Sequence, residues 1–526
     1  MDVVDPRPLL APLLSFACAG LVFAAGENVF WRRFWTFLAA GAKLLVVLSM
    51  LPGTLAGTVY VSHVVTFTPG VSIALRADAY GMFFALVSST LWVLTTIYAI
   101  GYMRGSKDRA RFFGFFALCV STTVGIAFAE NLLTFFLFYE TLTICTYPLV
   151  VHAETPQALR AGRIYLTYTL LGGGFALIGS VMTLDLAGTL TLSQHGVFAS
   201  DTPTLALAAV FVALVLGFGV KAAIMPLHGW LPIAMVAPTP VSALLHAVAV
   251  VKVGAFGVTR VIYNVFGAEQ LQALGFATPL ALVAGFTILA GSVLAIRQDH
   301  LKRRLAYSTI SQLSYIVLGA ALLTPLGALA AIMHVANQAF AKITMFFVAG
   351  AIAKETGKTH VSELAGIATR LPWSMAAFTV AALSFVGLPL FAGFTTKWYL
   401  SLGALQGDAW WFVVVMLASS FLNAAYWFPI LHLAYFRAPE ATPEAMPDTP
   451  PDTPPQATPD AADGSDAGAA VGGPRRWETS KTLLVPILIC AAYVVLLGVT
   501  AEVPGMPTSV AVVAVERSFG MEAPLP

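Results

Sequence analysis

The chain has 526 residues, of which 58% are hydrophobic and only 10% are charged, and its mean hydropathy is +0.83. A soluble protein would carry about 25% charged residues, so this composition excludes a soluble globular fold. The net charge of +2 decides little, because the positions of the charges matter more than their sum.

Repeated apolar runs, each near the ~20-residue length that crosses a bilayer, predict an all-α polytopic membrane protein with about fourteen transmembrane helices. The expected spans lie near residues 9–26, 35–52, 79–101, 112–129, 132–151, 163–185, 204–224, 240–263, 275–296, 305–323, 326–352, 372–404, 410–436 and 482–501. Two of them contain strong helix breakers. The seventh runs into "KAAIMPLHGWLP", and the twelfth is too long for one plain crossing and contains "GLPLFAG". Both are therefore predicted to be broken helices.

The basic residues outside the spans are distributed unevenly. The loops after odd-numbered spans hold most of them, whereas the ends and the other loops carry only Arg7, Arg76, Arg260 and Arg517. Cytoplasmic loops are enriched in Lys and Arg, so the odd-numbered loops are expected in the cytoplasm and both termini outside. The membrane is expected to be the inner membrane of the cell.

Residues 438–480 differ in kind from the rest of the chain. They are rich in Pro, Ala and Asp and have no hydrophobic periodicity, which predicts a disordered cytoplasmic linker before the last span.

Five lysines and one carboxylate fall inside the spans, where a charge costs ~2.5–3.5 kcal/mol or more. They are Lys43, Lys221, Lys252, Lys342, Lys397 and Glu140. Intramembrane ionisable residues mark ion paths and proton relays, and snorkelling of a lysine toward the headgroups is the alternative. For Lys43, snorkelling or structural pairing is preferred, because no broken helix accompanies it.

Glu140 lies near the centre of the fifth span, too deep to reach the surface. An unpaired carboxylate there would be protonated, so a cationic partner from another helix is expected. Lys221 is the natural candidate, because the helix break beside it frees carbonyls and admits water.

A polar stripe is expected on the eleventh span, where His334, Gln338 and Lys342 recur at every fourth residue and share one helical face. Such a stripe faces protein or water, and we interpret it as part of a hydrated path, with structural hydrogen bonding as the alternative. His246 lies six residues before Lys252, about 120° away on a regular helix, so the two need not touch. His246 is weighed equally as a packing residue and as a relay residue, and His228 is a further candidate.

Lys221 and Lys397 each adjoin a broken helix, five spans apart. An odd offset gives two copies opposite orientations, so we predict two inverted five-helix repeats. The predicted division is 1–110 for the N-terminal helices, 111–265 and 274–436 for the repeats, 437–480 for the linker and 481–526 for the last helix and tail.

Several of these stretches resemble the proton-translocating, antiporter-like subunits of respiratory complex I and of Mrp-type cation/proton antiporters. The matching stretches are "FLFYETLTICTYPLV", "GVKAAIMPLHGWLPIAMVAPTPVSALLHAVAVVKVGAFG", "DHLKRRLAYSTISQLSYIVLG", "HVANQAFAKITMFFVAGAI" and "GLPLFAGFTTKW". The resemblance covers roughly residues 80–435, and the length is similar to that of a subunit of the D type.

The resemblance implies a role for each buried charge. Glu140 and Lys221 would form the family's ion pair, and Lys252 would be its central relay lysine. His334 and Lys342 would continue the hydrated axis to the terminal site at Lys397.

Three kinds of function are considered at this stage. One is a proton-conducting subunit of a larger membrane complex, driven by redox chemistry in partner subunits or by coupled cation exchange. The second is a self-contained Na⁺ or K⁺/H⁺ antiporter. The third is a membrane scaffold subunit or part of an inorganic-carbon uptake module, and a pure scaffold would not need the buried charges. GxGxxG, CxxC and haem signatures are absent from the sequence, so we expect no catalytic residue, metal or cofactor in this chain. The expected partners are other membrane subunits, protons and the lipid bilayer, with Na⁺ or K⁺ as further candidates and no nucleic acid.

The stretch "LGGG" at 171–174 is interpreted as a helix-packing motif.

Overall fold

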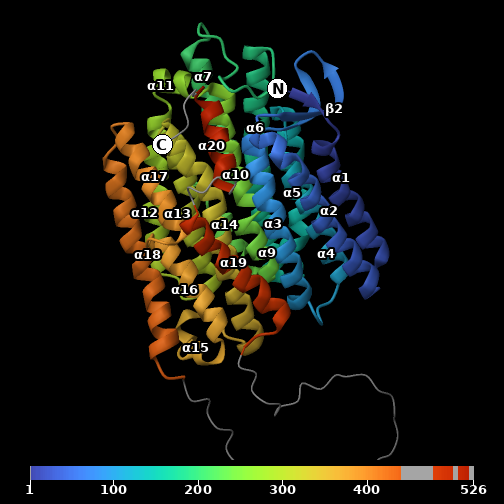
Figure 1. Ribbon diagram of the computed structural model, residues 1–526, viewed down its shortest axis with the longest axis vertical. Coiled ribbons are helices and arrows are strands. Elements are labelled where there is room, and N and C mark those ends of the chain that lie inside the picture. Colours follow the sequence, from blue (N-terminus) through green and yellow to red (C-terminus); the bar gives the residue numbers. More distant parts are fainter. Residues whose placement is uncertain (1, 440–477, 501–506, 521–526) are drawn as a thin grey trace, which may run out of the picture.

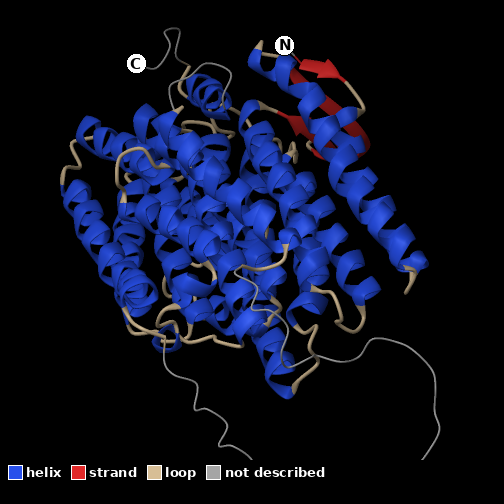
Figure 2. Ribbon diagram, turned by 60° about the horizontal axis from the view of Figure 1, so that its bottom comes forward, coloured by secondary structure: helices blue, strands red, loops and turns tan. Residues whose placement is uncertain are grey.

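The computed structural model describes residues 2–439, 478–500 and 507–520, which form a bundle of long helices with a small sheet at one end (Figure 1, Figure 2). Within these ranges, 12 helical segments are long and apolar enough to cross a membrane. They are α1 (Arg7–Ala25), α2 (Val29–Leu55), α3 (Ala79–Tyr102), α4 (Arg109–Ala127), α5 (Leu132–Val150), α6 (Pro156–Ala187), α7 (Thr204–Ala222), the segment Thr239–Phe266, α12 (Ala277–Ile296), α14 (Pro325–Thr356), α18 (Trp411–Phe436) and α19 (Lys481–Val499). The predicted helical membrane fold is confirmed.

The two remaining predicted spans form helices that are shorter or less apolar. The tenth is α13 (Leu301–Ala321), which carries several hydroxyl and charged side chains. The twelfth divides into α16 (Pro372–Val386) and α17 (Ala392–Gln406), with Gly387 in a left-handed conformation (φ 92°) at the end of α16. The predicted break of the twelfth span is thus confirmed. Helix α16 ends at Gly387 because glycine adopts the left-handed conformation without a steric penalty.

The seventh span is broken as predicted, and the eighth is interrupted as well. After α7 the next helix is the short α8 (Trp230–Ile233), which is followed directly by the turn η1 (Ala234–Val236). The eighth span then divides into α9 (Thr239–Ala247) and α10 (Val250–Arg260), and it ends in a π-helical turn, η2 (Val261–Phe266). Neither proline nor glycine stands between α9 and α10, so the sequence offered no breaker at this point.

A small sheet accompanies the helices at the N-terminal end, and it was not predicted. Strands β1 (Asp2–Val4), β2 (Val59–Thr68) and β3 (Val71–Ala77) form a sheet in the order β1-β2-β3, with β1 parallel and β3 antiparallel to β2. The sequence signal was present, since β2 is rich in Val, Thr and Tyr and is followed by Pro69 and Gly70 at the turn.

The short elements complete the described chain. They are α11 (Ala268–Leu274), η3 (Val361–Glu363), α15 (Ile367–Arg370) and α20 (Pro507–Ser518). Helix α20 was not predicted, and it packs on α3 and α14. Residues 440–477, most of the predicted linker, lie outside the described residues.

Two helical segments occupy the centre of the bundle. The most apolar stretches of Thr239–Phe266 and of α14 are buried along their whole length, whereas α1, α2, α6, α18 and α19 bury less than half of theirs. Helix α14 contacts α3, α9, α13, α16, α17 and α19. The predicted lysines and histidines of these two segments therefore lie where lipid cannot reach them, and their surroundings are set by other helices.

Candidate functional site in the helix bundle

The break after α7 creates a site for a cation. Lys221 is fully buried in the last turn of α7, where the helix dipole favours positive charge. Its ammonium donates a hydrogen bond to the carbonyl of Tyr139 and lies 3.3 Å from the centre of that ring. The next residue but one, Ala223, is left-handed (φ 55°), and the indole of Trp230 donates to the carbonyl of Val220 at 2.8 Å. The carbonyls freed by the break are thus partly occupied by specific donors.

Glu140 is the charged neighbour of Lys221. Its Oε1 atom is buried and has no hydrogen-bond partner among the described residues, and its carboxylate interacts electrostatically with Lys221 without a direct salt bridge. A Cβ atom at Gly173 of α6 would collide with this carboxylate, and one at Gly172 would collide with α7. The helix-packing interpretation of "LGGG" is confirmed, and Gly173 also makes room for Glu140.

Lys252 lies on α10 close to the end of α7. It is fully buried, and its ammonium has no hydrogen-bond partner among the described residues. The close approach of the helices depends on Gly254, where a Cβ would collide with the backbone of Ala222. His246 lies near the end of α9, with its ring centroid 4.8 Å from that of Phe346. Because the helix is interrupted between α9 and α10, the 120° separation expected for a regular helix does not apply.

The predicted polar stripe of α14 is fully enclosed by protein. The ring of His334 lies 5.4 Å from that of Tyr315 on α13, and it interacts electrostatically with Lys252 and Lys397. Within the described part of the chain, neither ring nitrogen of His334 and neither amide atom of Gln338 has a hydrogen-bond partner. Buried polar atoms of this kind are normally satisfied by ordered water, so the stripe fits a hydrated path.

Lys397 occupies the second helix break. Its ammonium donates to the carbonyls of Phe385 and Val386 at 2.9 Å each, which are the free carbonyls at the end of α16. It also donates to Ser420 Oγ of α18 at 2.7 Å.

A chain of hydrogen bonds connects Lys342 with Lys397. Lys342 donates to Ser308 Oγ at 2.8 Å, and Ser308 in turn bonds the hydroxyl of Tyr426 at 3.0 Å. Tyr426 donates to the side-chain carbonyl of Asn423, whose amide nitrogen donates at 3.0 Å to the same backbone carbonyl that accepts from Lys397. The intervening residues were missed by the sequence analysis, because uncharged polar side chains are common in apolar helices. Their only signal was a polar residue within a span.

Two candidates, a lysine and a histidine, stand apart from this arrangement. Lys43 is fully buried beside α3, with its ammonium 5.3 Å from the centre of the Trp92 ring. It does not snorkel, because helix α2 is covered at this point by other helices. His228 lies in the turn after α7, half-buried, with its ring 6.3 Å from that of Tyr307.

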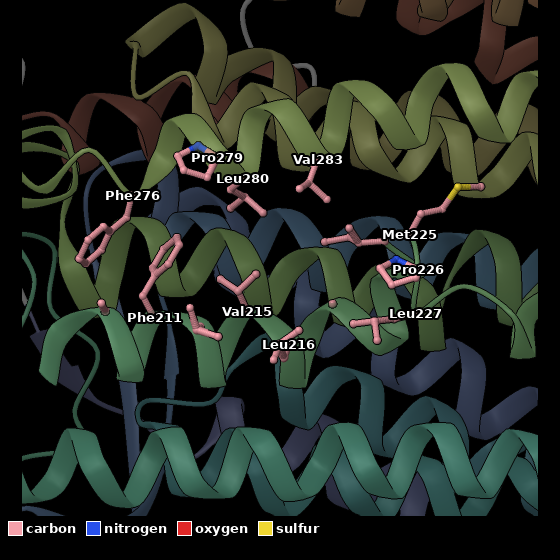
Figure 3. Close-up of a pocket in the computed structure, with 14 residues that line it drawn as sticks. Phe211, Val215, Leu216, Met225, Pro226, Leu227, Phe276, Pro279, Leu280 and Val283 are labelled. Carbon is pink, nitrogen blue, oxygen red and sulfur yellow. The ribbon is translucent and has the colours of Figure 1, made fainter. Parts of the chain in front are cut away.

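An apolar cavity of about 370 Å³ borders the α7 break (Figure 3). Phe211 and Leu216 of α7 face Leu280 and Val283 of α12 across it, and Met225, Pro226 and Leu227 close one end. Its lining contains no titratable side chain, so this cavity is separate from the row of charges.

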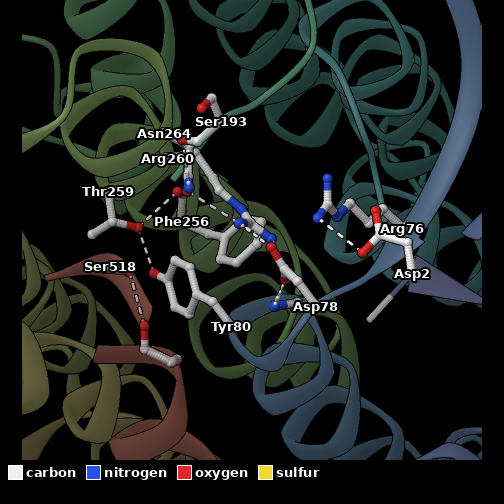
Figure 4. Close-up of polar contacts among 12 residues, drawn as sticks. Asp2, Arg76, Asp78, Tyr80, Ser193, Phe256, Thr259, Arg260, Asn264 and Ser518 are labelled. Atoms are coloured by element: carbon white, nitrogen blue, oxygen red, sulfur yellow. Dashed lines mark hydrogen bonds and ion pairs between the residues drawn. The ribbon is translucent and has the colours of Figure 1, made fainter. Parts of the chain in front are cut away.

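Arg260 was expected in a loop, and the structure places it in the last turn of α10, about two turns from Lys252. Its guanidinium donates to both carboxylate oxygens of Asp78 at 2.6 and 2.7 Å and to Asn264 at 3.1 Å (Figure 4). Burial alone would raise the pKa of Asp78, but the bound guanidinium lowers it below its ordinary value, so the carboxylate stays charged. This pair ties α3 to α10 at the end of the bundle that α20 covers.

Among residues 2–439, 478–500 and 507–520, no group of three or more His, Cys, Asp or Glu is arranged to hold a metal ion. The side chains that the fold does bring together are lysines, a glutamate, histidines and hydroxyls, all of which exchange protons.

Comparison with known proteins identifies the family. Residues 129–423 match the model described as NADH:quinone oxidoreductase/Mrp antiporter, TM, and residues 66–113 match NADH-ubiquinone oxidoreductase (complex I), chain 5 N-terminus. The chain is 35% identical over 420 residues to NADH-quinone oxidoreductase subunit N of Desulforudis audaxviator, covering 77% of this chain and 78% of that protein.

Other relatives are longer. Identity is 33% over 333 residues with NADH-quinone oxidoreductase subunit L of Mycobacterium tuberculosis, covering 62% of this chain and 51% of that protein. It is 30% over 404 residues with Na(+)/H(+) antiporter subunit A1 of Staphylococcus haemolyticus, covering 72% and 49%. This chain therefore spans about half the length of these two relatives.

Solved structures share the fold. A chain of the Mrp complex from Dietzia sp. DQ12-45-1b superposes with a TM-score of 0.83 at 23% identity, covering 98% of this chain and 99% of that one. A chain of the membrane-bound sulfane sulfur reductase, an archaeal respiratory membrane complex, gives 0.83 at 21% identity, with 98% of each chain covered. At this identity the likeness concerns the fold alone, but with the family model and the subunit N relative the assignment is complete: the chain belongs to the NADH:quinone oxidoreductase/Mrp antiporter transmembrane family.

Proposed function

We propose that this chain is a proton-translocating subunit of a multi-subunit membrane complex. The observation that carries the proposal is the row of buried titratable side chains through the two central helical segments, ending in the hydrogen-bonded chain between Lys342 and Lys397. A purely structural subunit gains nothing from such groups, because each buried charge lowers the stability of the membrane fold.

In this proposal the relay begins at Glu140 and Lys221, passes Lys252 and continues along His334 and Lys342 to Lys397. Burial favours the neutral form of a lysine and a neighbouring carboxylate favours the charged form, so moving a proton at one site changes the affinity of the next. Where the side chains lack protein partners, water completes the path. His246 is a further relay candidate, and so is His228, whose ring lies near that of Tyr307.

The inverted repeats, 111–265 and 274–436, are part of the same proposal. The two terminal lysines support it, because each lies next to a helix break and donates to backbone carbonyls, Lys221 at the end of α7 and Lys397 near the start of α17. Alternating use of two such breaks gives the relay one opening on each side of the membrane.

The driving reaction is proposed to lie in partner subunits, either redox chemistry or coupled exchange of Na⁺ or K⁺. The relatives named above include both NADH-quinone oxidoreductase subunits and a Na(+)/H(+) antiporter subunit, so both drivers stay open. A self-contained antiporter or an inorganic-carbon uptake module is the alternative. Native purification followed by identification of the co-purifying subunits separates these cases, and recovery of the chain alone in active form would contradict the complex.

Replacing Glu140 by glutamine should reduce proton transport at least about tenfold while the complex still assembles. Glutamine keeps the size of the side chain beside Gly173 but removes the negative charge next to Lys221, so the two groups no longer exchange protons as a pair. The measurement is proton uptake into vesicles that contain the purified complex, normalised to assembled complex. Unchanged uptake in the assembled variant would remove Glu140 from the relay.

The orientation in the inner membrane is proposed from the distribution of arginine and lysine. Both termini would lie outside, and residues 438–480 would lie in the cytoplasm. A single cysteine placed at Ser465 should react with a membrane-impermeant maleimide only after the cells are opened. A cysteine at Thr66 of β2 is the control and should react in intact cells. Ready labelling of the Ser465 position from outside would reverse the topology.

A further inference from the structure

A polar cavity of about 370 Å³ lies at the arginine-rich end of the bundle, where α6 and α13 begin. Its walls carry Gln157 and Arg160 of α6, Gln298, and Arg303 of α13, and no acidic residue lines it. Neither guanidinium makes a hydrogen bond or an ion pair with another described residue. Two arginines that converge on one cavity without a counter-charge are matched to an anion, since guanidinium groups bind phosphate oxygens in pairs.

Beyond this cavity, the same face of α6 lines an apolar groove. The lining of the polar cavity includes Ile164, and one turn further the same face of α6 lines a second cavity of about 170 Å³ with Tyr168, Leu171 and Phe175. Residues 157, 160, 164, 168, 171 and 175 follow at intervals of three and four, so they form one stripe on the helix. The second cavity has no polar surface exposed.

The groove ends at the break of α7. Leu216 and Leu227 line both the 170 Å³ cavity and the apolar cavity of Figure 3, which also contains Pro226. The first two cavities are thus lined by successive turns of α6, and the second and third share Leu216 and Leu227, so the three lie in order from the arginines to the turn beside Lys221.

We propose that this track binds one anionic phospholipid, with its phosphate between Arg160 and Arg303 and an acyl chain along α6. The polar end accounts for the phosphate, and the apolar continuation accounts for the chain, which a free phosphate ion lacks. A zwitterionic lipid has the same chains but no net charge to compensate the two arginines. Basic pockets between membrane helices at the cytoplasmic side select anionic headgroups in the same way.

The acyl chain meets the chain segment after the α7 break at Leu227 and Pro226. A bound lipid therefore holds this turn in place and stabilises the surroundings of Lys221. This consequence for transport rests on the proposed function, whereas the binding itself does not.

The test uses the intact purified complex after removal of bound lipid, with binding followed by native mass spectrometry. Phosphatidylglycerol should bind, phosphatidylcholine with the same chains should bind at least about tenfold more weakly, and inorganic phosphate should not displace the lipid. The double variant Arg160→Gln/Arg303→Gln should weaken phosphatidylglycerol binding at least about tenfold. Its matched control, Arg163→Gln/Arg297→Gln, removes one arginine of α6 and the arginine that follows α12, neither of which lines the cavity, and it should bind like the wild type.

A second variant tests the apolar half without altering charge. Leu171→Trp fills the groove and should weaken phosphatidylglycerol binding while leaving the arginines intact. Equal affinity in the arginine double variant, full displacement by inorganic phosphate, or a partner subunit crosslinked to a probe at Leu171 in the intact complex would each overturn the lipid assignment. Binding that follows these expectations in a complex without proton transport would instead contradict the proposed function alone.

Discussion

Replacing Lys252 by arginine should lower proton transport at least about a hundredfold in complexes that assemble normally. Arginine carries the charge but does not release its proton at any pH a protein tolerates. Lys252 is fully buried on α10 and interacts electrostatically with both His334 and Lys342 on α14, so a site that cannot lose its proton interrupts the path in both directions. Proton-transfer groups contribute about 10²–10⁴ in rate, which sets the expected loss.

Lys252→Met separates this effect from packing. Methionine is close to lysine in size and has no proton to give, so it should fail like arginine. Lys43→Met is the matched control, because Lys43 is equally buried but lies beside Trp92, outside the row of charges. It should keep transport, and its melting temperature should not fall, because it removes a buried ammonium that has no hydrogen-bond partner among the described residues. Proton uptake at the wild-type rate by Lys252→Arg would show that deprotonation at this position is not required.

Replacing Tyr426 by phenylalanine should reduce proton transport about tenfold or more. The hydroxyl of Tyr426 connects Ser308 with Asn423, and it is the central link between Lys342 and Lys397. Phenylalanine keeps the ring and its contact with Trp427, so the fold is preserved while the hydrogen-bonded chain is cut. The loss should appear in proton uptake per assembled complex, with the melting temperature nearly unchanged.

Tyr435→Phe on the same helix is the matched control. Its hydroxyl bonds Thr379 at 3.2 Å on the exposed side of α18, away from both lysines. It should transport protons like the wild type. If the two tyrosine variants behave alike, the Lys342–Lys397 connection has no part in transport and the path runs through other groups or through water.

The candidate site was partly readable from the sequence, because a charge inside an apolar run is energetically costly and therefore conspicuous. Glu140 and the five lysines within the spans were found in this way. Ser308, Asn423 and Tyr426 were not found, because a neutral polar side chain within a span costs little insertion free energy and does not by itself indicate a site. Their importance appears only in the fold, where Ser308 of α13 bonds Tyr426 of α18.

Two local expectations depended on more than one segment could specify. Lys43 was expected to snorkel or to be paired structurally; its burial excludes snorkelling, and the ammonium lies against the ring of Trp92. The angle between His246 and Lys252 assumed a regular helix, which is interrupted between α9 and α10, and the expectation that the two need not touch stays a prediction. In both cases contacts with distant segments set the surroundings of the side chain.

The membrane class, the approximate spans and the breaks at α7 and between α16 and α17 were predicted correctly from local patterns, because they depend on apolar length and on Pro and Gly within one segment. Only the packing of the helices shows which spans are central, that Lys221 bonds a carbonyl of α5 whereas Lys397 bonds the carbonyls at the end of α16, and which hydroxyls connect the lysines. The physical reason is that backbone hydrogen bonds of a membrane helix close within the segment, whereas a buried side chain finds its partner on another helix far away in the chain.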